Sequence, residues 1–295
     1  MYKKVEEYLE DLKKELEGTD PAVLQDALSD AEDHLRTGLD EMIQKDSSLS
    51  VQKALAKIIE DYGTPGETAA AYREIEKRLL PGLSIPKHKE PKTGLAIFFS
   101  VLADPKAWGA FVYMIFAVLT GTLFGLWAFL GMTVSLIAVI FIFGIPISSV
   151  FLLSLRGIAL IEGRIIEATL GVRMPRKPIF INPELDWLGK IKTLFSESQT
   201  WKSLLYFILL FPIGLVYFGL ISLIFVFSLG FIFAPFLELV LKLPLELFGT
   251  DVFTPVWLLP FVSIFGFLLL PSGFHLAKWI GKIHSRYAKF MLVRK

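Results

Sequence analysis

Long runs of apolar residues occupy the middle and the end of the chain. The longest, residues 107–155, holds 49 residues without Asp, Glu, Lys or Arg. A helix rises about 1.5 Å per residue and the hydrocarbon core of a bilayer is about 30 Å thick, so this run predicts two spans. We expect the turn between them at Gly131-Met132-Thr133. Two further uncharged runs, residues 203–237 and 253–276, predict a third and a fourth span.

The first 80 residues show a different pattern, in which apolar residues recur every three or four positions. This spacing predicts amphipathic helices that share one core. Capping signals support the boundaries: Asp20 precedes a proline, Ser50 precedes the third helix, and Thr64 and Glu67 fit a capping box. The predicted helices cover residues 2–16, 21–42, 51–62 and 65–79.

These patterns together predict an all-α protein with three parts. Residues 1–80 form a small helical bundle, which we expect in the cytoplasm. Residues 81–92 form a linker that contains three prolines and no periodic pattern. Residues 93–295 form a membrane domain with four spans.

The membrane domain contains an internal repeat, over about residues 93–175 and 186–295. Segment 103–108 is similar to 196–201, and Tyr113 and Gly121 recur as Tyr206 and Gly214, at an offset of 93. Near the ends of the repeats, the residues from Gly163 to Ile165 match those from Gly281 to Ile283, at an offset of 118. The second repeat is therefore expected to hold an insertion between its spans.

Amphipathic segments flank the predicted spans. In each repeat we expect one such segment in the membrane plane before the first span, because apolar residues share one face there. After the second span of each repeat, residues 156–172 and 278–295 predict a basic amphipathic helix that lies on the inner leaflet.

Charge is distributed unequally along the chain. Residues 1–92 contain 14 Lys and Arg against 20 Asp and Glu, a formal balance of −6, whereas residues 93–295 have a balance of +7. Within the membrane domain, basic residues gather in the connection 156–202 and after residue 278. The positive-inside rule then places both termini in the cytoplasm of a multi-pass cell-membrane protein. Segment 238–256 would face outward.

The composition excludes several classes of function. The chain has no Cys, which excludes disulfides, thiol nucleophiles and thiolate metal sites. Glu162 and Glu167 point about 140° apart on a helix, so they do not form an acid–base pair. Phosphate loops, nucleophile elbows and metal-ligand spacings are absent from the sequence, so we expect no enzymatic activity, no metal and no cofactor. The acidic N-terminal part lacks the basic footprint of direct nucleic-acid binding.

Two groups of residues are candidates for a functional role. Glu238, Glu246 and Asp251 lie in the outward segment, which could receive an input signal or could be an inert connector. Trp108 and Trp201 follow an acidic residue at the start of each repeat, and they are typical of interfacial anchors. Signalling hinges are the alternative for these tryptophans.

Residues of the N-terminal part carry a resemblance to a known family. They are the acidic centre Asp30 to Leu35, Ser50 with Ala54-Leu55, and the turn Tyr62-Gly63-Thr64-Pro65 with Glu67-Thr68-Ala69. This pattern resembles the HAAS signalling domain over about residues 1–75, although Tyr62 stands where that family usually has Leu. The resemblance implies an adaptor without catalytic residues that works with a regulatory protein, such as a PadR-type transcription regulator.

The membrane domain carries a second resemblance. The acidic residue and Trp that open each repeat, the run Leu170 to Pro175 and the repeat itself resemble the sensor domain found ahead of many bacterial and archaeal histidine kinases. The resemblance covers roughly residues 96–292 and implies a four-span sensory module. No kinase domain is visible in this sequence, so we expect the output to pass through the N-terminal bundle or a separate protein.

Two hypotheses for the function follow. The first is a non-enzymatic membrane sensor or signalling adaptor, which passes a signal from the envelope or the membrane to a cytoplasmic regulator or kinase. The second is a lipid-interacting scaffold that senses no ligand. The lipid bilayer is a partner in both. Ala117, Gly121 and Gly125 place small residues on one helix face. This face could join two copies in a homo-oligomer or, at least as readily, pack against another span of the same chain.

Overall fold

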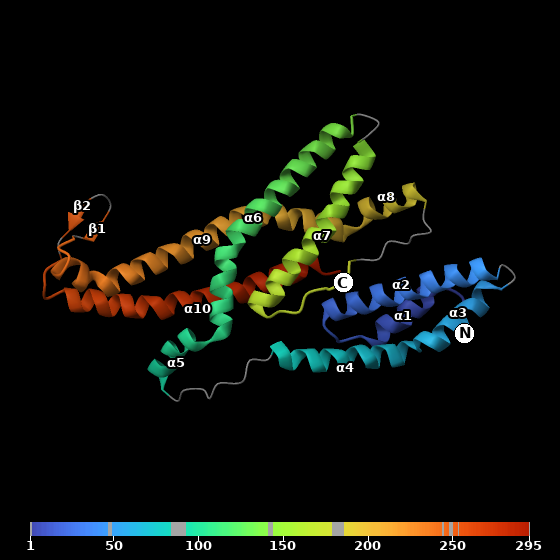
Figure 1. Ribbon diagram of the computed structural model, residues 1–295, viewed down its shortest axis with the longest axis horizontal. Coiled ribbons are helices and arrows are strands. Elements are labelled where there is room, and N and C mark those ends of the chain that lie inside the picture. Colours follow the sequence, from blue (N-terminus) through green and yellow to red (C-terminus); the bar gives the residue numbers. More distant parts are fainter. Residues whose placement is uncertain are drawn as a thin grey trace. The chain divides into compact units, whose positions relative to one another are not determined.

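The computed structural model describes residues 2–46, 49–83, 93–140, 144–178, 186–243, 245–247, 250–252 and 254–294 (Figure 1). Its described elements are almost all helical, and this confirms the predicted all-α class. The small exception is a hairpin of β1 (Leu245–Leu247) and β2 (Thr250–Val252), which are antiparallel, with Glu246 opposite Asp251.

Four helices form the N-terminal bundle: α1 (Val5–Glu15), α2 (Pro21–Lys45), α3 (Val51–Tyr62) and α4 (Pro65–Leu83). Their core includes fully buried Tyr8, Leu12 and Leu35. The Tyr8 hydroxyl donates to the Gly63 carbonyl oxygen at 2.9 Å and lies 3.0 Å from Thr68 Oγ1, which ties α1 to the turn between α3 and α4. The predicted shared core is therefore present.

Two of the predicted helix caps are confirmed. Asp20 accepts a hydrogen bond from the Ala22 backbone N–H at 2.9 Å. The Thr64 N–H donates to Glu67 at 2.8 Å and the Glu67 N–H to Thr64 Oγ1 at 3.4 Å, which completes the capping box. Ser50 occupies the predicted N-cap position of α3, but its side chain makes no capping hydrogen bond in the described chain.

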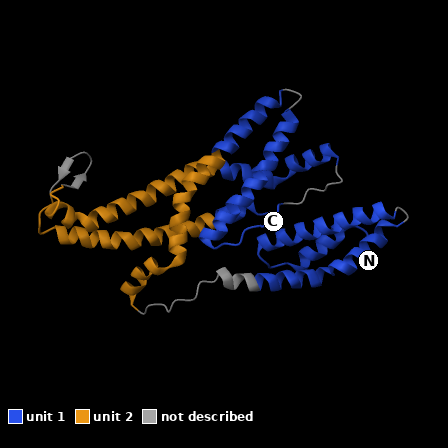
Figure 2. Ribbon diagram, viewed as in Figure 1, with its two compact units in different colours: residues 1–86, 126–208, 286–295 blue, residues 87–125, 209–285 orange. Residues whose placement is uncertain are grey.

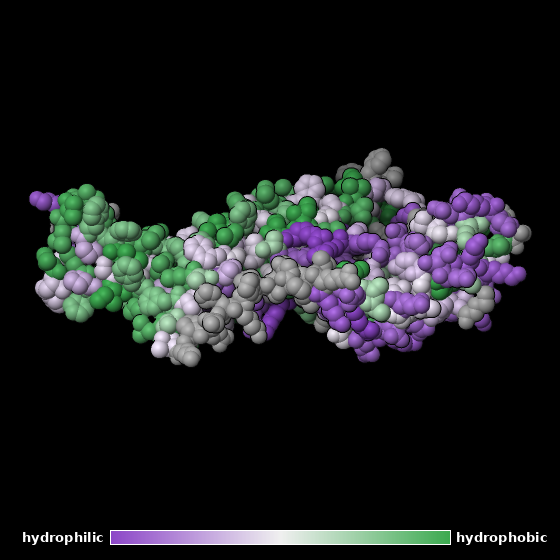
Figure 3. Space-filling view, turned by 60° about the horizontal axis from the view of Figure 1, so that its bottom comes forward, coloured by the Kyte–Doolittle hydropathy of each residue, from purple (hydrophilic) through white to green (hydrophobic). Residues whose placement is uncertain are grey.

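Four long apolar helices are able to cross a membrane: α6 (Pro105–Ala138), α7 (Gly144–Leu170), α9 (Ser198–Leu239) and α10 (Leu259–Leu292). Only 22–39% of the most apolar window of each helix is buried inside the protein. Figure 3 shows hydrophobic residues over these helices and hydrophilic residues over the bundle. A bilayer is the environment that suits such exposed apolar surface, so this is a multi-pass membrane protein.

The boundaries of these helices correct three predictions. The turn does not lie at residues 131–133, because α6 continues through Gly131, which packs against the ring of Phe151. The basic helices expected on the inner leaflet do not exist as separate elements, since α7 and α10 continue without a break to Leu170 and Leu292. Helix α4 reaches Leu83, two residues beyond the predicted start of the linker, and residues 84–92 lie outside the described chain.

Short helices precede the first and the third spanning helix, as expected from the flanking amphipathic segments. They are α5 (Gly94–Ser100), followed by the 3₁₀ turn η1 (Val101–Ala103), and α8 (Trp187–Ser196).

The chain divides into two compact units (Figure 2). Unit 1 contains residues 1–86, 126–208 and 286–295, and unit 2 contains residues 87–125 and 209–285. The bundle thus groups with all of α7 and α8 and with parts of α6, α9 and α10.

Within unit 2, α6 and α9 cross at two glycines. A Cβ on Gly121 would lie 2.6 Å from the carbonyl oxygen of Leu210, and a Cβ on Gly214 would collide with the carbonyl oxygen of Ala117. Each glycine thus packs against the backbone four residues before the other. Only glycine allows the two backbones to approach this closely.

Candidate functional site

A short basic segment follows helix α7 within unit 1. Gly171 ends the helix with a φ of +66°, and its N–H donates to the Glu167 carbonyl oxygen at 3.2 Å. The chain then continues without regular structure through Arg173, Arg176 and Lys177. We refer to residues 171–178 as the basic segment.

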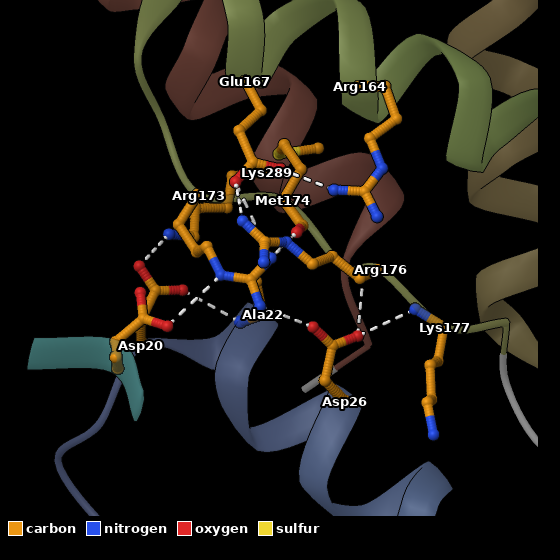
Figure 4. Close-up of polar contacts among 11 residues, drawn as sticks. Asp20, Ala22, Asp26, Arg164, Glu167, Arg173, Met174, Arg176, Lys177 and Lys289 are labelled. Carbon is orange, nitrogen blue, oxygen red and sulfur yellow. Dashed lines mark hydrogen bonds and ion pairs between the residues drawn. The ribbon is translucent and has the colours of Figure 1, made fainter. Parts of the chain in front are cut away.

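The basic segment binds the acidic face of α2 (Figure 4). Arg173 Nη2 lies 2.7 Å from Asp26 Oδ2, and the other oxygen of Asp26 accepts the backbone N–H groups of Arg176 and Lys177 at 2.7 and 2.9 Å. The side chains of Asp26 and Arg173 are 7% and 10% exposed. A buried carboxylate that accepts three hydrogen bonds is well satisfied, so this contact is specific in direction as well as in charge.

Further ion pairs surround this central contact. Lys177 pairs with Asp30, and Lys289 on α10 pairs with Asp20 at the start of α2. Arg173 Nε also lies 3.4 Å from Glu76 on α4. The segment after α7 and helix α10 therefore both contact the bundle through basic residues.

Glu167 holds the basic segment on the α7 side. Its carboxylate, which is 7% exposed, accepts from Arg176 Nη2 at 2.9 Å and from Arg164 Nη1 at 3.0 Å. The carboxylates of Asp26 and Glu167 thus face the same group of arginines from opposite sides, one from the bundle and one from the membrane helix.

The surroundings of Asp30 shift the pKa of its carboxyl. Burial raises the pKa of this carboxyl, but hydrogen bonds from Lys177 and from the Tyr72 hydroxyl, the latter at 2.5 Å, outweigh burial and lower the pKa below its usual value. Burial and the Asp30 charge raise the pKa of Tyr72 well above its ordinary value, so its hydroxyl remains a donor.

A second polar centre lies inside unit 1, within the long helices. Arg156 on α7 pairs with Glu197 and donates to Thr200 Oγ1 at 3.2 Å. Two turns further along α7, Glu162 accepts a hydrogen bond from the Tyr206 hydroxyl at 3.2 Å. The sequence analysis placed both charged residues on a surface helix, whereas they are buried against α9.

Unit 2 contains a related centre around His284. This histidine is 1% exposed, with Nε2 2.5 Å from the Tyr113 hydroxyl and Nδ1 3.3 Å from the Tyr217 hydroxyl. Lys278 on the same helix pairs with Asp104 at 2.6 Å. No role was predicted for His284 from the sequence, because its neighbours do not have metal-ligand spacing.

The predicted site residues occupy separate places. Glu238 is 7% exposed, and its carboxylate accepts from Thr254 N–H at 2.8 Å and Thr254 Oγ1 at 2.7 Å, so it joins the end of α9 to the chain before α10. The strand register of the hairpin places Glu246 opposite Asp251.

The two candidate tryptophans have the same local geometry. Trp108 Nε1 donates to the Leu102 carbonyl oxygen at 2.7 Å, and Trp201 Nε1 donates to the Phe195 carbonyl oxygen at 2.8 Å, in both cases six residues earlier. Each indole ring is about half exposed, at 46% and 47%. These positions suit an aromatic ring at a membrane interface.

The contacts of the basic segment recognise charged groups. Among the residues that the structure describes, no group of three or more His, Asp or Glu side chains is placed to hold a metal ion. The ion pairs of the basic segment instead join the helical bundle to the chain that follows α7.

Comparison with known proteins adds one finding. No curated protein and no solved structure matches the chain. Residues 113–292 match the family described as "Putative sensor". The match covers all four membrane-crossing helices except the start of the first. The chain therefore belongs to this sensor family.

Proposed function

We propose that this protein is a non-enzymatic membrane signalling adaptor in which the contact between α2 and the basic segment transmits the signal. The observation that carries this proposal is the buried pair of Asp26 and Arg173, with two further backbone donors on the same carboxylate. Membership of a sensor family supports a signalling role. The attachment depends mainly on charge, which makes it easier to reverse than a large apolar interface.

The basic segment has a second natural partner in the anionic surface of the inner leaflet. Clusters of Lys and Arg next to a membrane helix are attracted to such a surface by about 1 kcal/mol per residue. The acidic α2 and the membrane would therefore compete for Arg173, Arg176 and Lys177. A signal that moves α7 or α10 would shift this competition and release or retain the bundle.

The released bundle would act on a cytoplasmic regulatory protein. The resemblance of residues 1–75 to the HAAS domain supports this assignment, and so does the acidic surface of the bundle, which suits a basic partner such as a PadR-type regulator or a kinase. The bundle uses Asp26 and Asp30 to bind the basic segment and Asp20 to bind Lys289 on α10. A partner that binds α2 would therefore exclude the attached state. For the bundle to reach a cytoplasmic partner, both termini of the chain must lie in the cytoplasm.

We infer further that the membrane domain is a duplication, because polar contacts recur between equivalent positions. The contact Asp104–Lys278 corresponds to Glu197–Arg156, and the contact Tyr113–His284 corresponds to Tyr206–Glu162. In both comparisons the first-named residues are 93 positions apart in the chain and their partners are 122 positions apart.

Glycine contacts follow the same offsets. A Cβ on Gly144 would meet Ala138 and Val139, and a Cβ on Gly266 would meet Phe231 and Ile232. These contacts favour an offset of 122 over the 118 taken from the sequence, a difference of about one helical turn. Helix α7 would then correspond to α10, and α6 to α9.

The attachment is tested by measuring one distance in unit 1. The chain has no Cys, so spin labels attach only at engineered positions, and Thr37→Cys on α2 with Lys192→Cys on α8 places both on exposed sites. We expect a narrow distance distribution in the unaltered background. The single changes Asp30→Lys and Lys177→Asp should each broaden it, and the double change should restore it. An unchanged distribution in both single variants contradicts the proposal.

The scaffold hypothesis has a different outcome. If the protein acts only by binding lipid, the state of the bundle does not matter to any partner. A partner that binds the full chain equally well with and without the charge changes would favour that alternative.

A further inference from the structure

Arg156 has hydrogen-bonding capacity that the protein does not use. Its side chain is 9% exposed, and Nη2 carries the contacts to Glu197 and Thr200. Its other two nitrogens, Nε and Nη1, are buried and have no hydrogen-bond partner among the residues that the structure describes. Buried N–H groups on a charged side chain are costly to leave unsatisfied, so a partner for them is expected.

These nitrogens belong to a side chain that lines a pocket in unit 1. The other lining groups include Gln25 on α2, Pro175 of the basic segment, and Gln199, Thr200 and Ser203 at the start of α9. The pocket has a volume of about 30 Å³. This is roughly twice the volume that a single water requires, so a group larger than water fits.

The charge around the pocket favours an anion. Arg156 and Arg294 both lie beside Glu197, with Arg294 Nη1 3.4 Å from Glu197 Oε1. Two cations against one carboxylate leave one positive charge in excess. The hydroxyls of Thr200 and Ser203 provide further donors on the same wall of the pocket.

The position of Arg156 along the chain indicates which anion. It is the first charged residue after the 49 uncharged residues 107–155, so it lies where α7 leaves the apolar region. Trp201, about half exposed, marks the same level on α9. Phosphate groups of lipids lie at this level, and guanidinium groups bind phosphate through several N–H donors at once.

We propose that this pocket is a binding site for a phosphate group, from a phospholipid headgroup or from free phosphate, with Arg156 Nε and Nη1 as its main donors. This inference rests on the proposed attachment of the bundle, because Gln25 belongs to α2 and Pro175 to the basic segment. The pocket is complete only while the bundle is attached. A bound phosphate therefore stabilises the attached state.

Binding is measured with the full chain in a non-ionic detergent that contains no phosphate. Inorganic phosphate is titrated against chloride at equal ionic strength, and a short-chain phosphatidylglycerol is titrated in a second series, both by calorimetry. Binding of inorganic phosphate identifies a site for the free anion. Binding of the lipid alone identifies a headgroup site.

Three variants separate a ligand role from a structural one. Arg156→Lys keeps the charge beside Glu197 but removes the guanidinium donors, and we expect binding at least about tenfold weaker. Arg156→Gln with Glu197→Gln removes both charges together, which avoids an unpaired buried carboxylate, and should abolish binding. Lys106→Gln changes an exposed cation in unit 2 and should weaken binding less than about twofold.

The outcomes distinguish this site from the proposed function. If neither phosphate nor lipid binds, or if Lys106→Gln weakens binding as much as Arg156→Lys, the phosphate site is wrong. The label distance between positions 37 and 192 then decides separately whether the attachment stands. Binding that depends on Arg156 but leaves this distance distribution unchanged keeps the site and removes its coupling to the bundle.

Discussion

Asp26 and Arg173 are 147 residues apart in the chain, yet their side chains meet at 2.7 Å in a place that solvent hardly reaches. The contact joins the second helix of a soluble bundle to the segment that leaves a membrane helix. Arg173 also faces Glu76 and Glu167, and Asp26 also accepts two backbone N–H groups, so the pair is the centre of a network. This makes it the first position to alter.

Asp26→Asn should loosen the bundle from the basic segment. Removing one member of a buried ion pair costs about 3–5 kcal/mol, and we expect the lower end because Glu76 and Glu167 still face Arg173. The change should broaden the label distance between positions 37 and 192. Asp33→Asn, on an exposed position of the same helix, is the matched control and should leave the distance unchanged.

Acid should weaken the attachment through Asp30. The folded pKa of this carboxyl is lower than its unfolded value of about 3.8, so its contribution is fully present above that value. The contribution is lost as the pH falls through the folded pKa. Between about pH 5 and 8 the attachment should not vary on account of this group.

The variant Asp30→Asn isolates that contribution. When the pH falls through 3.8, the label distance should change less in this variant than in the unaltered protein, because Asn does not titrate. A difference between variant and unaltered protein that grows above pH 5 would argue against Asp30 as the titrating group.

Cysteine labelling tests the topology. Thr250→Cys should react with a membrane-impermeant thiol reagent on intact cells, whereas Lys177→Cys should react only after the membrane is opened. Lys177 forms an ion pair with Asp30, which its replacement would remove. Lys192→Cys therefore provides a second position on the expected cytoplasmic side, at a residue with no ion pair among the described contacts. Labelling of all three positions in intact cells would be incompatible with four spans and cytoplasmic termini.

Gly121→Ala should destabilise the crossing of α6 and α9. The added Cβ would lie 2.6 Å from the Leu210 carbonyl oxygen, and forcing an extra carbon into such a contact costs about 1–3 kcal/mol. Gly219→Ala, on α9, is the control because nothing lies within 4 Å of its Cβ position. Thermal unfolding in detergent should show a lower midpoint for the first change and an equal or higher midpoint for the second.

A paired substitution tests the duplication. Gly131 faces Phe151 in unit 1, and at the equivalent positions in unit 2 Ile224 faces Gly273, with the large and small residues exchanged. Gly131→Ile alone should clash with the Phe151 ring and lower the unfolding midpoint. Adding Phe151→Gly should recover part of that loss, because the pair then copies its counterpart. No recovery would count against the equivalence of the two halves.

Local patterns predicted most of the fold. The capping box of Thr64 and Glu67 and the uncharged runs depend on neighbours in sequence, so one sequence is sufficient to find them. The ends of α7 and α10 could not be found in this way. Arg156, Glu162 and His284 look like surface residues until the helices that satisfy them are in place.

The charge distribution contained a signal for the attachment of the bundle. The formal charge is −6 in residues 1–92 and +7 in the rest of the chain, which indicates that the acidic part suits a basic partner. A net charge does not reveal whether its complement lies in another protein or in the same chain. Asp26, Arg173 and Lys177 show that part of the complement is internal.

Helix α2 is held at two points by two different membrane helices, through Arg173 after the end of α7 and through Lys289 on α10. A rigid rod fixed at two points tilts when one point moves and the other does not, and keeps its tilt when both move together. In the proposed mechanism, the bundle would therefore be insensitive to displacements common to both membrane helices, such as a uniform change in bilayer thickness. It would respond to a difference between the two displacements, so the two ion contacts together would report the movement of one helix relative to the other.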